Sequence, residues 1–187
     1  MNKRIENRRV RMTKRLMKDA LLELMEEKEL ANISVTAICE TADVHRSTFY
    51  NYYTDPADLL RDIEQDYLDM IPTPPEILDP QNEKTLLAAT SDYFDFVREN
   101  KKTFQILFSS SSGSSFAAQM VKRLCHGYIP VGESPDDLTT RFTQLYIASG
   151  TVGMLREWIN EDSPLSALSG SELAEMMYTL SRRVSQY

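Results

Sequence analysis

The sequence predicts an all-α protein with two regions. Apolar residues recur at steps of three and four along most of its 187 residues, which is the period of an amphipathic helix. No stretch alternates apolar and polar residues in the way that predicts a strand. Four prolines between residues 72 and 80 interrupt the helical pattern and stiffen the segment between the two regions.

The first helix is predicted from about residue 10 to residue 30. Apolar residues at steps of three and four form one stripe, which consists of Met12, Leu16, Ala20, Leu21, Leu24 and Met25. The stripe predicts that this helix covers the core of the N-terminal region.

Two short helices and a three-residue turn follow, which is the layout of a helix-turn-helix. Ser34 is the predicted N-cap of a helix over residues 35–42. Residues 43–45 form the turn, and a second helix covers residues 46–53. In such a unit the first helix supports the second, which enters the major groove of DNA.

A further helix is predicted to join the two regions. Asp55 followed by Pro56 is a good pair of N-cap and first helical residue. The helix continues to about residue 71. We therefore expect a basic arm and helix-turn-helix domain over residues 1–54 and a C-terminal helical domain over residues 55–187, bridged by this helix.

The C-terminal region is expected to consist of helices separated by two loops. The serine-rich segment 109–115 and the segment 130–135 are the loops. The predicted helices cover residues 83–100, 101–108, 116–128, 136–160 and 171–184.

Positive charge is concentrated at the N-terminus. Residues 1–18 hold eight basic residues and one acidic residue, a balance of +7 in a chain whose total is −7. This asymmetry favours a nucleic-acid contact near the N-terminus, although a solvated tail that binds nothing would have the same composition. No apolar run is long enough to span a membrane, no secretion signal is recognised, and a cytoplasmic protein is expected.

The motifs of catalytic and metal sites are missing from the sequence. Cys39 and Cys125 are far apart, and zinc-ligand spacing with His45 or His126 is absent. No nucleophile elbow or phosphate-binding loop occurs. An enzyme is therefore not expected, nor is a metal or cofactor.

The second short helix has one apolar and one polar face. Phe49 and Tyr53, with Ile38 and Val44, are predicted to pack between the helices. Polar and aromatic side chains remain for bases and phosphates. An ordinary helical bundle with tyrosines on its surface is the alternative. The predicted DNA-binding residues of the turn and second helix are His45, Arg46, Ser47, Thr48, Tyr50, Asn51 and Tyr52.

These segments are similar to a known family. An apolar helix is followed by I-S-V-x-x-I-C-x-x-A-D-V-H-R-S-T-F-Y-N-Y-Y and by a capped helix ending in D-L-L. Over roughly residues 10–60 the sequence resembles the TetR family of bacterial transcription regulators. The resemblance implies that Thr48, Tyr50 and Tyr52 contact phosphates, and that Thr36 on the supporting helix also contacts DNA.

The chain departs from the pattern of the family at three positions. Asp43 stands where glycine is usual, and Tyr52 stands where histidine is frequent. Pro56 replaces a lysine that commonly binds phosphate, so one anchor is missing. Our hypothesis is that the basic arm compensates by reaching along the backbone or into the minor groove. The predicted DNA-binding residues of the arm are Arg8, Arg9 and Arg11.

The resemblance also implies a homodimer that pairs through the last two helices as a four-helix bundle. Long apolar stripes fit this role, and Ala148, Ser149, Gly150 and Gly153 would permit close approach of backbones. The alternative is that the stripes bury only the core of the monomer. Two recognition helices on a two-fold axis would read a palindromic operator.

An effector pocket inside the C-terminal helices is a further implication of the resemblance. Its ligand would be an apolar or aromatic small molecule, although plain core is the favoured interpretation of each candidate residue. The candidates are Tyr93, Phe94, Phe104, Phe108, Phe116, Phe142, Tyr146 and Trp158.

We therefore expect a regulator that represses transcription from double-stranded operator DNA and is released by its effector. Release would be a shift of population toward a conformation that does not bind the operator. The alternative is a regulator of the same type that acts mainly through a protein partner and has no small-molecule ligand.

Overall fold

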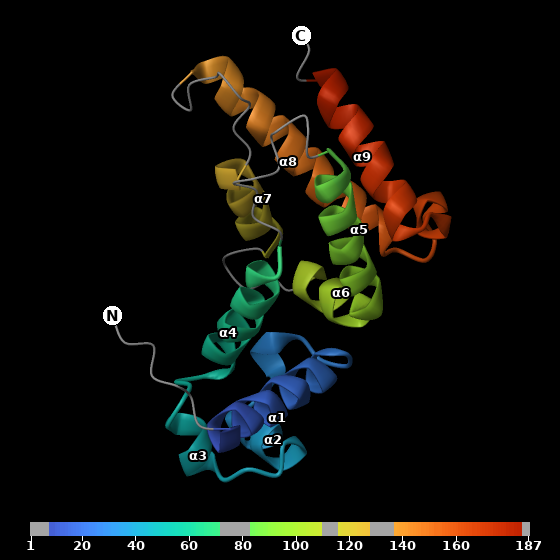
Figure 1. Cartoon of the computed structure of the whole chain (residues 1–187). Coiled ribbons are helices and arrows are strands. Elements are labelled where there is room, and N and C mark those ends of the chain that lie inside the picture. The colour runs from blue at the N-terminus through green and yellow to red at the C-terminus, as the bar shows by residue number, and fades with distance from the viewer. Residues whose placement is uncertain (1–7, 72–82, 110–115, 128–136, 185–187) are drawn as a thin grey trace. The chain divides into compact units, whose positions relative to one another are not determined.

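The computed structural model describes residues 8–71, 83–109, 116–127 and 137–184, and every regular element in these ranges is a helix (Figure 1). The all-α prediction is therefore confirmed. The predicted proline segment and the two predicted loops lie almost wholly outside the described ranges. The helices are α1 (Arg8–Met25), α2 (Val35–Thr41), α3 (Arg46–Tyr50), α4 (Pro56–Asp69), α5 (Glu83–Glu99), α6 (Lys101–Ser109), α7 (Phe116–Gly127), α8 (Leu138–Trp158) and α9 (Gly170–Val184), with the 3-10 turns η1 (Leu30–Asn32) and η3 (Pro164–Ala167).

The chain divides into two compact units, residues 1–67 and residues 68–187. The division falls near the end of α4, so that this helix belongs to both units. None of the described helices has the length and apolar composition needed to cross a bilayer.

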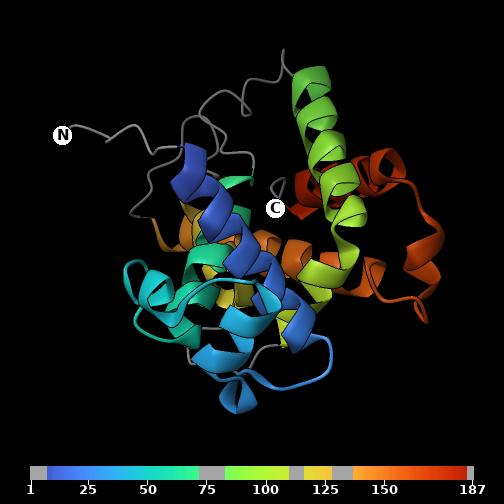
Figure 2. The ribbon, with the colours of Figure 1, turned by 90° about the horizontal axis from the view of Figure 1, so that it is seen from below.

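In the first unit, α1 lies across the helix-turn-helix and packs on α2 (Figure 2). It buries Met17, Ala20 and Leu21, whereas Met12 and Leu16 are exposed. Ala20 and Leu21 of the predicted stripe thus face the core, whereas its first two residues do not. Burial of each large apolar side chain contributes about 1.5–3 kcal/mol to the core.

The first helix also ends earlier than predicted, at Met25. Residues 26–29 are all charged, so a longer helix would bury no apolar group until Leu30. The chain turns here through a hydrogen bond from the Lys28 amide to the Leu24 carbonyl at 3.1 Å, and η1 follows.

The start and end of α2 are set by local hydrogen bonds. The Ser34 side chain accepts a hydrogen bond from the Ala37 amide at 3.1 Å, which confirms the predicted N-cap. At the other end, the Val44 amide donates to the Cys39 carbonyl at 3.0 Å and the Asp43 amide donates to the Glu40 carbonyl at 3.3 Å. This pair of bonds is a Schellman motif.

A capping pair also begins α4. The Asp55 carboxylate accepts from the Asp58 amide at 2.7 Å, as predicted for an N-cap. The Asp58 carboxylate accepts in return from the Thr54 amide at 3.0 Å, and this bond, followed by the ion pair with Arg61, lowers the pKa of Asp58. Two amide donors at the start of α4 are thereby satisfied.

In the second unit, α5 lies beside α9, and α7 packs on α8 (Figure 1). Gly170 begins α9 so close to α5 that a Cβ atom there would lie 2.6 Å from a carboxylate oxygen of Asp95. The preceding Ser169 and the first-turn Glu172 form a capping box. The Ser169 amide donates to the Glu172 carboxylate at 2.8 Å, and the Glu172 amide donates to the Ser169 hydroxyl at 3.2 Å.

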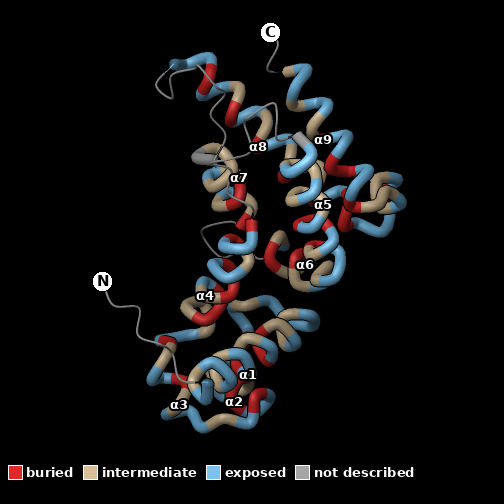
Figure 3. The backbone as a smooth tube through the Cα atoms, in the orientation of Figure 1, coloured by how far each residue is buried: buried red, intermediate tan, exposed pale blue. Residues whose placement is uncertain are grey.

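The long helix α8 has apolar residues on two faces, which appear as alternating buried and exposed bands (Figure 3). Thr140, Gln144, Ala148, Val152 and Leu155 are buried in the unit. Other large apolar side chains of the helix point away from this core. Those that are exposed are Leu138, Phe142, Leu145 and Tyr146.

Candidate nucleic-acid interface

The five-residue helix α3 and the turns around it carry the predicted DNA-binding side chains. Its inner side is anchored by Phe49 and Tyr53, which are 0% and 5% exposed. We name the outward-facing set the recognition face. Its residues are His45, Arg46, Ser47, Tyr50 and Asn51, which are exposed, and Thr48 and Tyr52, which are half-buried.

α3 is shorter than the predicted helix over residues 46–53. Residues 51–53 continue as a turn in which the Tyr53 amide donates to the Phe49 carbonyl at 3.0 Å. The ring centroids of Phe49 and Tyr53 are 5.7 Å apart, so the turn keeps both aromatic residues in the core.

Arg46 and Tyr50 lie one helical turn apart on the recognition face. A guanidinium nitrogen of Arg46 donates to the Tyr50 hydroxyl at 3.5 Å, and this bond raises the pKa of Arg46. The contact directs both polar groups to the same area of surface. Thr36 is also exposed, one residue into α2.

The predicted arm residues Arg8, Arg9 and Arg11 are exposed on the first turns of α1. The helix thus begins earlier than predicted, and these three arginines are part of it. The first turn holds no acidic residue, although a helix N-terminus favours negative charge. Three positive groups at this end are unfavourable for the helix alone and suit a polyanionic partner. Lys3 and Arg4 lie outside the described residues.

A groove of about 430 Å³ separates α1 from α4 in the first unit. The Nζ atom of Lys14 lies 5.8 Å from the ring centroids of both Tyr52 and Tyr53. Deeper in the groove, Lys18 forms ion pairs with Asp62 at 2.9 Å and Asp66 at 2.5 Å. No local sequence pattern predicts this contact, because Lys18 and Asp62 are 44 residues apart.

The second unit brings together most of the predicted effector residues. Ring-to-ring contacts connect α5, α6, α7 and α8, with centroid separations from 5.5 to 6.3 Å. The sequence analysis missed Phe96, which lies 6.1 Å from Phe104. We name this group the aromatic cluster, and its residues are Tyr93, Phe94, Phe96, Phe104, Phe108, Phe116 and Trp158.

Two polar groups of the aromatic cluster differ in how they are satisfied. The indole nitrogen of Trp158 donates to the Leu168 carbonyl at 2.9 Å. The Tyr93 hydroxyl is buried and has no hydrogen-bond partner among the described residues. Burial raises the pKa of Tyr93, so its hydroxyl stays protonated and able to donate.

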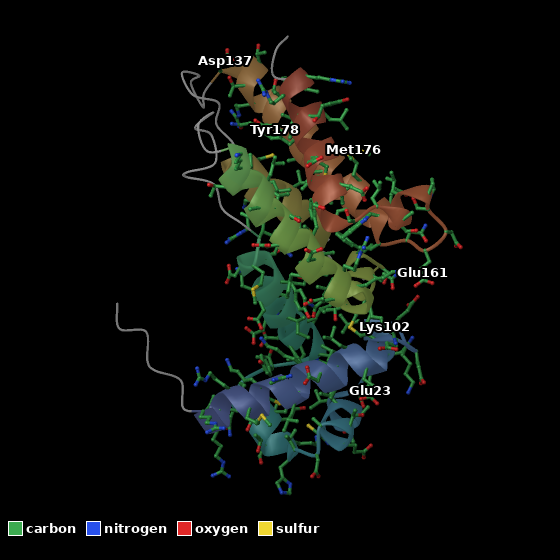
Figure 4. The ribbon with its side chains drawn as sticks, turned by 45° about the vertical axis from the view of Figure 1, so that its right-hand side comes forward. Glu23, Lys102, Asp137, Glu161, Met176 and Tyr178 are labelled. Carbon is green, nitrogen blue, oxygen red and sulfur yellow. The ribbon has the colours of Figure 1, made fainter. Side chains whose placement is uncertain are left out.

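Phe142 and Tyr146 do not join the aromatic cluster. Their side chains are 69% and 68% exposed on the outer face of α8, so they line no interior pocket of this unit. On α9, Met176 (labelled in Figure 4) and Leu180 are exposed in the same way. We name this set the α8/α9 face, and its residues are Leu138, Phe142, Leu145, Tyr146, Met176 and Leu180.

Comparisons with known proteins agree with this architecture. A TetR family model, described as a transcriptional regulator C-terminal region, matches residues 84–183. Over 98 residues the chain is 34% identical to the HTH-type dhaKLM operon transcriptional activator DhaS of Lactococcus lactis. That alignment covers 52% of the chain and 49% of DhaS, so the chain spans about half the length of the curated relative it matches.

Solved structures with the same fold extend over nearly the whole chain. A structure of the dihydroxyacetone kinase operon activator DhaS has a TM-score of 0.65 at 21% identity, over 94% of this chain and 97% of that one. A TetR transcriptional regulator from Streptococcus agalactiae has a TM-score of 0.64 at 20% identity, over 96% and 99%. The family match, which covers more than half of the chain, shows that this protein belongs to the TetR family of transcriptional regulators.

Proposed function

We propose that the protein binds double-stranded operator DNA through the recognition face. The observation that carries the proposal is the division of residues 46–53, in which Phe49 and Tyr53 are buried while Arg46 and Tyr50 are exposed. Guanidinium, hydroxyl and amide groups on an exposed helix suit the major groove and the adjacent phosphates. The arginines at the start of α1 add attraction to phosphate that does not depend on sequence.

We further propose that two copies pair through the α8/α9 face. Large apolar side chains are exposed there in the monomer, although burial of each would contribute about 1.5–3 kcal/mol. Gly150 and Gly153 are exposed on α8, and nothing lies within 4 Å of a Cβ atom built on either. A second helix has room to approach at these glycines. Pairing would place two recognition helices about 34–36 Å apart, one turn of DNA.

A binding experiment with purified protein tests the DNA proposal. The protein is used to enrich duplexes from a random library, and the affinity of the enriched duplex is compared with that of a scrambled duplex. Arg46→Ala and Tyr50→Ala should each weaken specific binding, by about tenfold to a hundredfold for a lost bidentate Arg contact. Lys102→Ala is the matched control, since it removes a positive charge from the second unit.

If no duplex is enriched, or if both variants keep the parent affinity, the recognition face is not the DNA-binding surface. Circular dichroism of each variant should be unchanged, because both substituted side chains are exposed.

Repression by occupation of the operator is the proposed effect on transcription. The description of the relative DhaS as a transcriptional activator supports a second candidate, activation from the same site. A reporter gene placed behind the enriched duplex separates them. Expression of the protein should lower reporter output under repression and raise it under activation.

We propose the aromatic cluster as the place where an apolar or aromatic effector acts. Its rings already pack on one another as a core, so a ligand would have to enter by displacing part of it. The support for a ligand is the buried Tyr93 hydroxyl, which has no partner in the described structure and could donate to one. Release of the enriched duplex by an aromatic compound, abolished in Tyr93→Phe, is the expected result.

Action mainly through a protein partner is the competing proposal. In that case the protein would bind DNA weakly, and compounds would not alter binding. Addition of cell lysate would then be required for a footprint, whereas the purified dimer suffices under the leading proposal.

A further inference from the structure

Tyr53 lies where the helix-turn-helix meets α4. Its ring is 5% exposed and packs against Phe49, the buried anchor of α3. Its hydroxyl donates to the Asp62 carboxylate on α4 at 2.6 Å. A short hydrogen bond to a charged acceptor is both stronger and more directional than a neutral one. The inner end of the recognition helix is therefore tied to α4 by one polar contact as well as by packing.

Lys18 completes the contact from α1. Its Nζ atom lies 2.9 Å from an Asp62 carboxylate oxygen and 2.5 Å from Asp66, and its side chain is only 16% exposed. Helix α1, helix α4 and the turn after α3 thus meet at the Asp62 carboxylate. We name this group the Tyr53–Asp62–Lys18 clasp.

Asp62 and Lys18 of the clasp are held in their charged forms. Burial alone would raise the pKa of Asp62, but the hydrogen bond from Tyr53 and the ion pair with Lys18 lower it overall. Burial alone would lower the pKa of Lys18, but its contacts with Asp66 and Asp62 raise it overall. The charge-assisted geometry therefore persists at neutral pH.

Partly buried ion pairs contribute little net stability, because desolvation opposes the attraction. Their directional contacts can instead select one arrangement of helices. Here the arrangement selected is that of a helix of only five residues, which has few internal hydrogen bonds of its own. Its outward groups must be placed to within a fraction of an ångström to bind bases well.

We propose that the Tyr53–Asp62–Lys18 clasp is a positioning contact for operator binding, in which Asp62 sets the orientation of α3 through the Tyr53 hydroxyl. This inference rests on the proposed DNA-binding function. The clasp acts through the recognition face, so none of its three side chains needs to touch DNA.

The test compares the enriched duplex with a scrambled duplex of the same length. Tyr53→Phe removes only the hydroxyl and keeps the ring against Phe49. It should weaken binding to the enriched duplex by about tenfold, the effect of losing one charged hydrogen bond, and leave binding to the scrambled duplex unchanged. Asp62→Asn should give a similar loss.

Asp66→Asn is the matched control. It makes the same chemical change on the same helix and weakens a contact to the same ammonium group, whereas the hydrogen bond of the Tyr53 hydroxyl goes to Asp62. Its specific affinity should remain within about twofold of the parent. The double variant Tyr53→Phe with Asp62→Asn should lose less affinity than the sum of the two single losses, because both changes weaken the same Tyr53–Asp62 hydrogen bond, while Asp62→Asn also weakens the ion pair to Lys18.

Several results would overturn the inference. Parent affinity in Tyr53→Phe would do so, as would losses that add in the double variant. A purely structural role would lower specific and scrambled binding together, in proportion to the fraction unfolded, which thermal melts of each variant measure. If the parent protein enriches no duplex, the proposed function itself is overturned. If the parent does enrich one, the ratio of enriched to scrambled affinity in the variants tests the clasp alone.

Discussion

Asp43 occupies a left-handed backbone conformation, with φ of 51°, at the turn between α2 and α3. It is the C′ residue of the Schellman motif that ends α2, a position where glycine is favoured because it has no Cβ atom. Aspartate tolerates this conformation better than most side chains do, but still at a cost in free energy. The departure from the family pattern noted in the sequence thus has a conformational consequence.

Asp43→Gly is expected to raise the free energy of unfolding by about 0.5–1 kcal/mol, because relief of backbone strain exceeds the added entropy of the unfolded chain. Urea denaturation measures the change. Glu40→Gly, inside α2 with ordinary helical backbone, is the control and should lower stability by about 1 kcal/mol. Equal destabilisation by both substitutions would contradict the strain at Asp43.

Tyr93 provides a second prediction at this scale. A buried hydroxyl without a partner costs about 1–3 kcal/mol, so Tyr93→Phe should stabilise the ligand-free protein by about 1 kcal/mol. Thermal melting measures the shift, and Tyr146→Phe, at an exposed side chain, should have no effect. Destabilisation by Tyr93→Phe would mean that the hydroxyl already has a partner in the folded protein.

At the scale of the element, the contact between α1 and α4 predicts how stability depends on pH. The pKa of Asp62 is lowered from 3.8 in the fold, so its contribution is present above that value and is lost as pH falls through the folded pKa. The pKa of Lys18 is raised from 10.5, so its contribution is present below that value and is lost as pH rises through the folded pKa.

The difference in unfolding free energy between the parent and Lys18→Met should therefore be constant between about pH 5 and pH 10. It should shrink only below about pH 4, as the pH falls through the lowered pKa of Asp62. Urea denaturation across this range, with Lys101→Met as the control for the separate ion pair to Glu161, measures it. A difference that changes between pH 6 and pH 8 would show that another group titrates with the clasp.

The elements also show which features could be predicted from sequence. Ser34 and Asp55 cap their helices through bonds to residues three positions away, so local pattern was sufficient. Tyr53 was correctly predicted to point inward, but its bond to Asp62 depends on how α4 returns beside α1. The early end of α1 follows from the four charged residues 26–29, which come directly after the helix. The prediction extended the apolar stripe across them.

At the scale of the whole molecule, α8 shows why the inner and outer residues of the C-terminal helices were hard to separate from sequence. The helix is apolar on its outer side as well as toward its own unit, so periodicity did not distinguish core from surface. Phe142 and Tyr146 were accordingly grouped with Trp158, which lies in the aromatic cluster. Only the three-dimensional packing of α7 and α9 against α8 separates the two faces.

The exposed apolar side chains of the α8/α9 face lead to a prediction about the proposed dimer. Phe142→Glu places a charge among exposed apolar side chains, where the proposed dimer would have to bury it without a partner. Sedimentation analysis should then find a dimer for the parent and a monomer for the variant. Because Phe142 is 69% exposed in the monomer, the helical signal by circular dichroism should be retained.

Loss of the dimer should also reduce operator affinity by at least a hundredfold, since one recognition helix contacts only one half-site. Ala167→Glu adds the same charge at an exposed position of η3 that is not part of the α8/α9 face, and should leave both mass and affinity unchanged. A Phe142→Glu protein that remained dimeric would place the interface on another surface. A monomer that kept full operator affinity would separate DNA binding from pairing, because the recognition face would then act alone.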